Sequence, residues 1–197
     1  MTLKAILAVT ALGTMATGAV AQNFDGVSFG AGVTNFGLSL EGEYTVTPQV
    51  GVRGMVMGGF SFDDEFDVDD ATIDGEVDLG GVAVLADYYP LGNAWRLSGG
   101  LFFSTSEVTG TVTDGLVTYD GQINFKNEVA PLISTGFSTE VASGWSVSGD
   151  IGVIVSSLEV SSDDDTGTVQ ADIAELNADL EDVPVLPFIG VAVSYSY

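Results

Sequence analysis

Large apolar residues alternate with small or polar residues along most of the chain. From Ile189 to Tyr197, every odd position carries Ile, Val or Tyr, and every even position carries Gly, Ala or Ser. A period of two residues is typical of a β-strand, whose successive side chains point to opposite faces. The pattern recurs between turn-forming residues and predicts eight antiparallel strands. Their approximate bounds are Val27 to Thr34, Phe36 to Val46, Val50 to Phe62, Val77 to Tyr89, Trp95 to Ser106, Val129 to Val141, Trp145 to Leu158, and Val185 to Tyr197.

Residue type indicates which face of these strands is turned inward. Alternation alone also fits a soluble β-sandwich with its apolar side inside. In the segments Trp95–Ser106 and Trp145–Leu158, however, the face opposite the large residues is mostly Gly and Ser with isolated charges. A solvated surface normally carries long charged and polar side chains, whereas small residues fit a narrow interior. The sequence therefore predicts an all-β fold, a closed antiparallel up-and-down transmembrane β-barrel of about eight strands.

Turn lengths and aromatic positions favour the same membrane barrel. The connections Thr47–Gln49, Pro90–Ala94 and Ala142–Gly144 are tight, whereas three others are long. Short periplasmic turns and long external loops are typical of outer-membrane barrels, as is a girdle of aromatic residues at the lipid interface. We expect the girdle to include Tyr44, Tyr88, Trp95, Trp145, Tyr195 and Tyr197.

The first 21 residues are predicted to be a cleaved signal peptide. Lys4 gives a positive start, Ala5–Leu12 is an apolar run, and Ala19–Ala21 supplies a small-residue cleavage site. A transmembrane anchor is the alternative, but the apolar run is shorter than the roughly 20 residues that a spanning helix needs. The predicted organisation is therefore a signal peptide at 1–21 and one barrel domain at 22–197, exported to the outer membrane.

Charge and composition exclude several functions. The chain has 28 acidic and four basic residues, a formal charge of −24 that would repel a nucleic acid. It has no Cys and no His, which removes thiolate nucleophiles and imidazole bases. Carboxylate pairs could still act as acid and base, but nothing in the sequence places two of them in an apolar cleft. We therefore expect no enzymatic activity and no cofactor.

Acidic residues concentrate in the first long connection, which is expected to be a solvated loop. Carboxylate oxygens at this density could hold Ca²⁺ or Mg²⁺, but the spacing does not match a calcium-binding EF-hand loop. The favoured interpretation is a loop kept extended by charge repulsion, with only weak and diffuse association of divalent cations. The candidate ligands are Asp63, Asp64, Asp67, Asp69 and Asp70.

The last long connection is predicted to contain a short amphipathic helix from Thr168 to Asp182. Its apolar residues recur at helical spacing at Val169, Ile173, Leu176 and Leu180. Acidic residues at its C-terminal end oppose the helix dipole, so packing against another element must hold it. It could cap the barrel mouth, lie against the rim, or simply connect two strands.

Charged residues on the inward face of the strands are expected to form an ion-pair network in the periplasmic half of the barrel. An isolated buried charge is costly, and both arginines of the mature chain are on this face with acids on nearby strands. Eight-stranded barrels have interiors that side chains nearly fill, so the network should plug the lumen rather than gate it. Its members are Glu41, Glu43, Arg53, Asp87, Arg96 and Asp150.

Four segments resemble the OmpW-like and OmpA-like barrel superfamily of small outer-membrane proteins in Gram-negative bacteria: Leu85–Leu101, Val129–Gly136, Gly144–Val153 and Pro187–Tyr197. The resemblance implies that Tyr195 and Tyr197 belong to the C-terminal signal read by the outer-membrane assembly machinery. Members usually end in Phe, whereas this chain ends in Tyr197. Membrane lipid and lipopolysaccharide are the other expected partners, with lipopolysaccharide contacting the acidic external loops.

Three functions remain open. The leading hypothesis is a non-catalytic envelope protein with a packed lumen, acidic external loops and a structural or surface role. The second is a narrow channel for small, possibly hydrophobic solutes, because OmpW-like members are associated with such passage. The third is a secreted acidic β-sandwich that binds a soluble ligand.

Overall fold

The computed structural model describes residues 26–196 apart from 69–70, 115–116, 164–166 and 183. The predicted signal peptide, Asp69, Asp70 and Tyr197 lie outside the described residues. Within the described part, no helix has the length and apolar character needed to cross a membrane.

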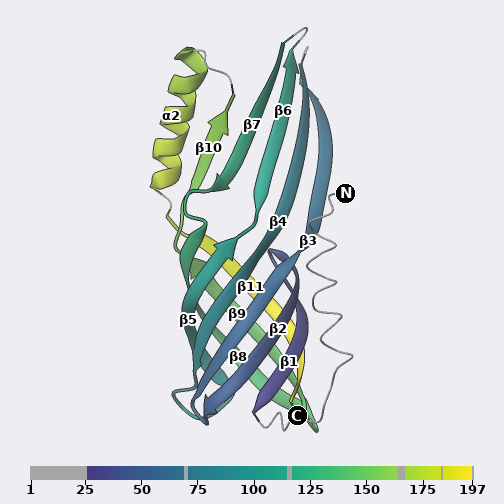
Figure 1. The fold of residues 1–197 in the computed structure, drawn as a ribbon, viewed down its shortest axis with the longest axis vertical. Helices are drawn as coiled ribbons and strands as arrows, with labels where there is room; N and C mark the ends of the chain where they lie inside the picture. Colours follow the sequence, from purple (N-terminus) through teal and green to yellow (C-terminus); the bar gives the residue numbers. More distant parts are fainter. Residues whose placement is uncertain (1–25, 69–70, 115–116, 164–166, 183, 197) are drawn as a thin grey trace.

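Eight antiparallel strands close into a barrel, as the sequence predicts (Figure 1). Each strand pairs with the next around the barrel, and β1 closes it by pairing with β11, for example Val33 opposite Val191. Closure leaves no open sheet edge in the barrel, which is the condition for a sheet to cross a lipid bilayer. The strands are β1 (Val27–Thr34), β2 (Gly37–Thr47), β3 (Val50–Val68), β4 (Ala71–Tyr88), β5 (Trp95–Ser104), β8 (Val129–Ala142), β9 (Trp145–Ile154) and β11 (Leu186–Ser196).

The barrel is apolar outside and polar in part of its interior. Outward residues such as Ile133 and Ile151 are 58% and 61% exposed, whereas the inward Arg53 and Arg96 are each 1% exposed. This is the reverse of a soluble core, in which large apolar side chains are buried and long charged ones are solvated. The exterior therefore fits hydrocarbon, and the predicted orientation of the strands agrees with the structure.

Three further strands and the upper parts of β3 and β4 form a second region, which we call the extension sheet. The added strands are β6 (Glu107–Asp114), β7 (Val117–Phe125) and β10 (Leu158–Ser162). They continue the sheet in the order β3-β4-β6-β7-β10, and this sheet rises beyond one end of the barrel (Figure 1). We call that the extended end, and the opposite end, with the tight turns, the short-turn end.

The prediction that the first long connection is a solvated loop is therefore wrong. β3 and β4 remain paired from Val50 opposite Tyr88 to Val68 opposite Ala71, through most of the acidic segment. Asp63, Asp64 and Asp67 thus lie on a strand. The Asp63 side chain is exposed on one face of this two-sided sheet, so high charge did not prevent strand pairing.

A β-bulge at Gly58–Gly59 separates the barrel part of β3 from its extension. Met57 lies opposite Gly81 and Phe60 opposite Leu79, so β3 has one more residue than β4 between these two pairs. Gly59 has a φ of 88°, which favours glycine because it has no Cβ. The extra residue shifts the alternation by one position, so Phe60 continues the inward face that Met57 occupies below.

The helix α2 (Gly167–Glu181) confirms the predicted helix and lies beside β10 (Figure 1). The side-chain amide of Asn177 accepts from the Val160 N–H at 2.7 Å and donates to the Val160 carbonyl at 2.9 Å. Lys126 forms an ion pair with Glu181 at the end of the helix. The helix lies at the outer edge of the extension sheet, a position that differs from the three expected from the sequence.

Candidate functional site

The lumen contains a network of buried ion pairs centred on Arg53 of β3. Its Nε lies 2.9 Å from Asp87 Oδ2, and its Nη1 lies 2.9 Å from Asp150 Oδ2 and 3.6 Å from Glu41 Oε2. Its Nη2 also donates to Ser98 Oγ at 3.4 Å. These partners come from β2, β4, β5 and β9, so one guanidinium connects strands on several sides of the barrel.

Asp150 of β9 joins the two arginines. Its Oδ2 also lies 2.5 Å from Arg96 Nη2, and its Oδ1 accepts from Arg96 Nε at 3.3 Å. Charge-assisted bonds in which two groups of one guanidinium contact one carboxylate hold both partners in a fixed orientation. The structure thus brings together five of the six residues that the sequence assigned to a lumen network: Glu41, Arg53, Asp87, Arg96 and Asp150.

The sixth residue, Glu43, lies apart from these ion pairs. Its Oε1 accepts a hydrogen bond from the Tyr89 hydroxyl at 3.3 Å. Burial raises the pKa of the Tyr89 phenol, and the negative charge of Glu43 adds to this shift. The phenol therefore stays protonated and acts as the donor at neutral pH.

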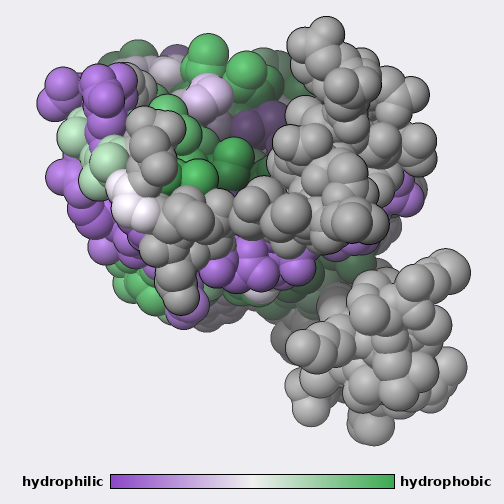
Figure 2. Space-filling view, turned by 90° about the horizontal axis from the view of Figure 1, so that it is seen from above, coloured by the Kyte–Doolittle hydropathy of each residue, from purple (hydrophilic) through white to green (hydrophobic). Residues whose placement is uncertain are grey.

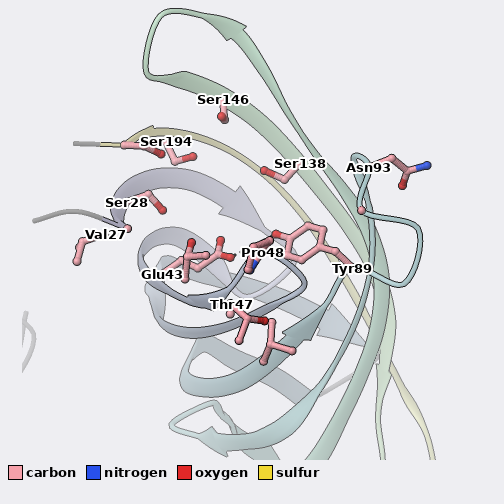
Figure 3. A pocket seen from close by; sticks show the side chains of 16 residues that line it. Val27, Ser28, Glu43, Thr47, Pro48, Tyr89, Asn93, Ser138, Ser146 and Ser194 are labelled. Carbon is pink, nitrogen blue, oxygen red and sulfur yellow. Dashed lines mark hydrogen bonds between the residues drawn. The ribbon is translucent and has the colours of Figure 1, made fainter.

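Glu43 and Tyr89 line a pocket of about 350 Å³ at the short-turn end of the barrel. Figure 3 shows the Tyr89 ring reaching from the turn after β4 toward Glu43 on β2. Most of the remaining wall is made of small residues and hydroxyls, including Ser28, Ser138, Ser146 and Ser194. The pocket is a polar vestibule, and the ion-pair network on the same inward faces of the strands lies deeper in the barrel.

An apolar layer fills the lumen toward the extended end. Phe36 and Phe102 have ring centroids 5.0 Å apart, and Phe125 lies 6.2 Å and 5.8 Å from them. Seen from the extended end, hydrophobic residues gather at the centre of the molecule (Figure 2). The buried members are Phe36, Met55, Met57, Ala83, Leu85, Phe102, Ala130, Leu132, Ile154 and Phe188. The lumen is therefore filled by two successive layers, one ionic and one apolar.

The sequence reasoning missed this apolar layer. Met55, Met57, Leu85 and Leu132 occupy inward positions but were not separated from the outward apolar residues beside them. The available signal was the strand alternation itself, because Arg53, Met55 and Met57 share one face of β3.

Of the residues assigned to weak cation binding, Asp63, Asp64 and Asp67 lie on β3, and Asp69 and Asp70 lie outside the described residues. Asp63 is an exposed residue of β3, opposite Glu76 of β4. Among the described residues, no group of three or more acidic side chains converges as a metal site would require. Divalent cation binding therefore remains a prediction from the sequence.

Aromatic residues at the short-turn end lie where the membrane interface is expected. Tyr44, Tyr88, Trp95 and Trp145 are between 40% and 55% exposed. The Trp95 indole donates to Thr135 Oγ1 at 2.8 Å, so its polar N–H is satisfied while the ring faces outward. The Trp145 ring contacts Tyr195, one of the two residues of the predicted assembly signal, at a centroid distance of 5.2 Å.

Comparison with known proteins supports the fold class. No family model matches the chain, and no curated protein sequence is significantly similar to it. Two solved structures from Acinetobacter baumannii match it, CarO2 with a TM-score of 0.63 and CarO with 0.62, each at 20% identity. The matches cover 87% and 88% of this chain and 98% of each of those chains. A more distant match is a major outer membrane protein from Thermus thermophilus, at 16% identity with a TM-score of 0.46.

The chain thus has the fold of a small outer-membrane β-barrel, closed by eight antiparallel strands. The predicted resemblance to such barrels is confirmed at the level of the fold. At 20% identity, the two Acinetobacter baumannii matches bear on the fold alone.

Proposed function

We propose that this protein is a non-catalytic, non-conducting barrel of the Gram-negative outer membrane whose role is structural or lies in the sheet that it displays at the cell surface. The short-turn end would face the periplasm and the extended end the exterior. This orientation follows the usual arrangement of outer-membrane barrels, with short turns inside and long connections outside.

The proposal rests on one observation, that an ionic layer and an apolar layer both fill the lumen. Arg53, Asp87 and Arg96 are each at most 1% exposed and lie in the ion-pair layer. Phe102, Leu132 and Ile154 are fully buried in the apolar layer above it. An ion or polar solute would have to break charge-assisted bonds and then cross a closely packed aromatic layer.

The extension sheet supports the second half of the proposal. It adds three strands and a docked helix that the closed barrel does not need. A fold that served only to seal the barrel could connect β5 to β8, and β9 to β11, by short loops. The extra material instead builds an ordered surface outside the membrane, where partners are accessible.

Conductance of the purified protein in planar lipid bilayers tests the proposal. A general porin reconstituted in parallel serves as the control that the assay detects open barrels. We expect no regular conductance steps from the folded protein, identified by its heat-modifiable migration on gels. Reproducible steps of uniform size would contradict the proposal and favour the narrow channel considered above.

A further inference from the structure

We propose that the free edge of β3 in the extension sheet binds an extended segment of another protein, in which basic and apolar residues alternate. The segment would add to the sheet as a further strand, by β-augmentation. This inference goes beyond the sealed barrel, because it assigns a partner class to the surface sheet.

One edge of the extension sheet is open. β2 pairs with β3 only as far as Leu38 opposite Gly58. Among the described residues, no strand pairs with β3 on that side from Gly59 to Val68. An unpaired strand edge presents a row of backbone donors and acceptors and is a ready template for another strand.

The other edge of the same sheet is covered. At β10, the Asn177 side chain takes the place of a neighbouring strand by bonding both the N–H and the carbonyl of Val160. α2 also packs along this strand. Natural sheets commonly protect their edges in this way, so the difference between the two edges singles out β3 as the binding edge.

The two faces of the extension sheet differ in chemistry. One row across all five strands is entirely apolar and continues the inward face of the barrel: Phe62, Val77, Val108, Ile123 and Val160. The neighbouring rows on the opposite face carry five exposed carboxylates, at Asp63, Glu76, Asp78, Glu107 and Glu159. The bulge at Gly58–Gly59 sets this arrangement at the free edge, because it places Phe62 on the apolar face and Asp63 on the acidic one.

The edge residues specify the pattern of the incoming strand. Phe62 ends the apolar row and is 59% exposed, so it can cover an apolar side chain of an added strand. Ser61 and Asp63 flank it on the acidic face, where like charges already face each other at Asp63 and Glu76. A basic side chain would relieve this repulsion, since oppositely charged cross-strand pairs stabilise a sheet. Alternation of basic and apolar residues satisfies both faces at once.

A second copy of this chain does not fit the edge. The chain has only four basic residues. Arg53 and Arg96 are buried in the lumen, Lys126 is paired with Glu181, and Lys4 lies in the predicted signal peptide. Two β3 edges brought together would also place acidic residues side by side, which is destabilising. The partner must therefore supply its own positive charge.

Binding of synthetic peptides to the mature protein in lipid nanodiscs tests this proposal. The probe is a fluorescent nine-residue peptide that alternates Lys and Val, and its affinity is measured by anisotropy at low salt. One control peptide has the same composition with all Lys before all Val, and another is N-methylated at alternate residues to remove backbone donors. We expect each control to bind at least about tenfold more weakly, a difference of about 1.4 kcal/mol.

Matched variants locate the site on the sheet. Asp63→Lys should weaken binding of the alternating peptide at least about tenfold, since it reverses a charge at the free edge. Glu159→Lys makes the same charge change on the same face at the covered edge, four strands away, and should leave binding unchanged. Hydrogen exchange should show new protection of β3 amides around Gly59–Asp63 and none in β10 when the alternating peptide is bound.

Three results would overturn the proposal. The first is the absence of binding by the alternating peptide. The second is that the block peptide or the N-methylated peptide binds as tightly as the alternating peptide, which would indicate attraction to charge alone. The third is equal loss of affinity in Asp63→Lys and Glu159→Lys. None of these results depends on whether the barrel conducts.

Discussion

Replacing Arg53 by methionine should strongly destabilise the barrel, because the substitution removes the guanidinium that three buried carboxylates share, and only Asp150 keeps an ion pair with Arg96. The side chain is 1% exposed, and its guanidinium lies within 4 Å of Glu41, Asp87 and Asp150. At an effective dielectric constant of about 20, each such contact contributes roughly 4 kcal/mol of gross attraction, much of which the cost of desolvation offsets. Removing one partner of a buried pair typically costs about 3–5 kcal/mol, and we expect a loss in this range.

Lys126→Met is the matched control for this prediction. It removes the same kind of charge from an ion pair with Glu181 in which the two side chains are 41% and 56% exposed. Exposed pairs contribute at most about 1 kcal/mol. The free energy of unfolding is measured for both variants by urea titration in lipid vesicles, with tryptophan fluorescence as the readout. Similar small losses in the two variants would refute the idea that the lumen network is buried and tightly coupled.

A double variant separates loss of attraction from loss of packing. Asp87→Asn removes one of the charges that Arg53→Met leaves uncompensated. The double variant should therefore lose less stability than the sum of the two single variants, by about 1–3 kcal/mol. Simple additivity would indicate that Arg53 stabilises the barrel through its volume alone.

Two further substitutions test local features. Asn177→Ala removes both hydrogen bonds to Val160, each worth about 1 kcal/mol, and should expose the Val160 amide to hydrogen exchange. Glu175→Ala on the same helix is the control. If the Val160 amide stays equally protected in Asn177→Ala, Asn177 does not cover the sheet edge. Gly100→Ala should cost about 1–3 kcal/mol or block assembly, because its Cβ would lie 1.9 Å from the Val84 carbonyl oxygen. Gly99→Ala, with nothing within 4 Å of its Cβ, should be tolerated. An equal loss of stability in Gly100→Ala and Gly99→Ala would contradict the close approach of β4 and β5.

Alternation was sufficient to predict the barrel, because each membrane-spanning strand has one lipid face and one lumen face. The predicted segment Val27–Thr34 matches β1, and Trp95–Ser106 differs from β5 by two residues. The lumen charges could also be grouped from sequence, since a buried Arg53 in a narrow barrel has few partners other than inward acids.

The extension sheet could not be predicted in the same way. Its strands carry Thr, Asp and Glu on the solvated face, and this polarity is typical of loops when it is judged by composition alone. The Gly58–Gly59 bulge also shifts the alternation by one residue, so Phe60 and Phe62 do not continue the pattern of Met55 and Met57. A search that allowed one inserted residue at a glycine pair would have recovered β3 beyond the barrel.

The orientation of the barrel strands is tested most directly by two neighbouring residues of β5. Phe102 is fully buried in the lumen, and Phe103 is 39% exposed on the outside. In a background of Trp95→Phe and Trp145→Phe, each position is replaced in turn by tryptophan, and the protein is reconstituted with brominated lipids. The structure predicts strong quenching for Phe103→Trp and little for Phe102→Trp. Quenching of Phe102→Trp but not of Phe103→Trp, or quenching of Phe103→Trp by aqueous iodide alone, would contradict a lipid-facing exterior.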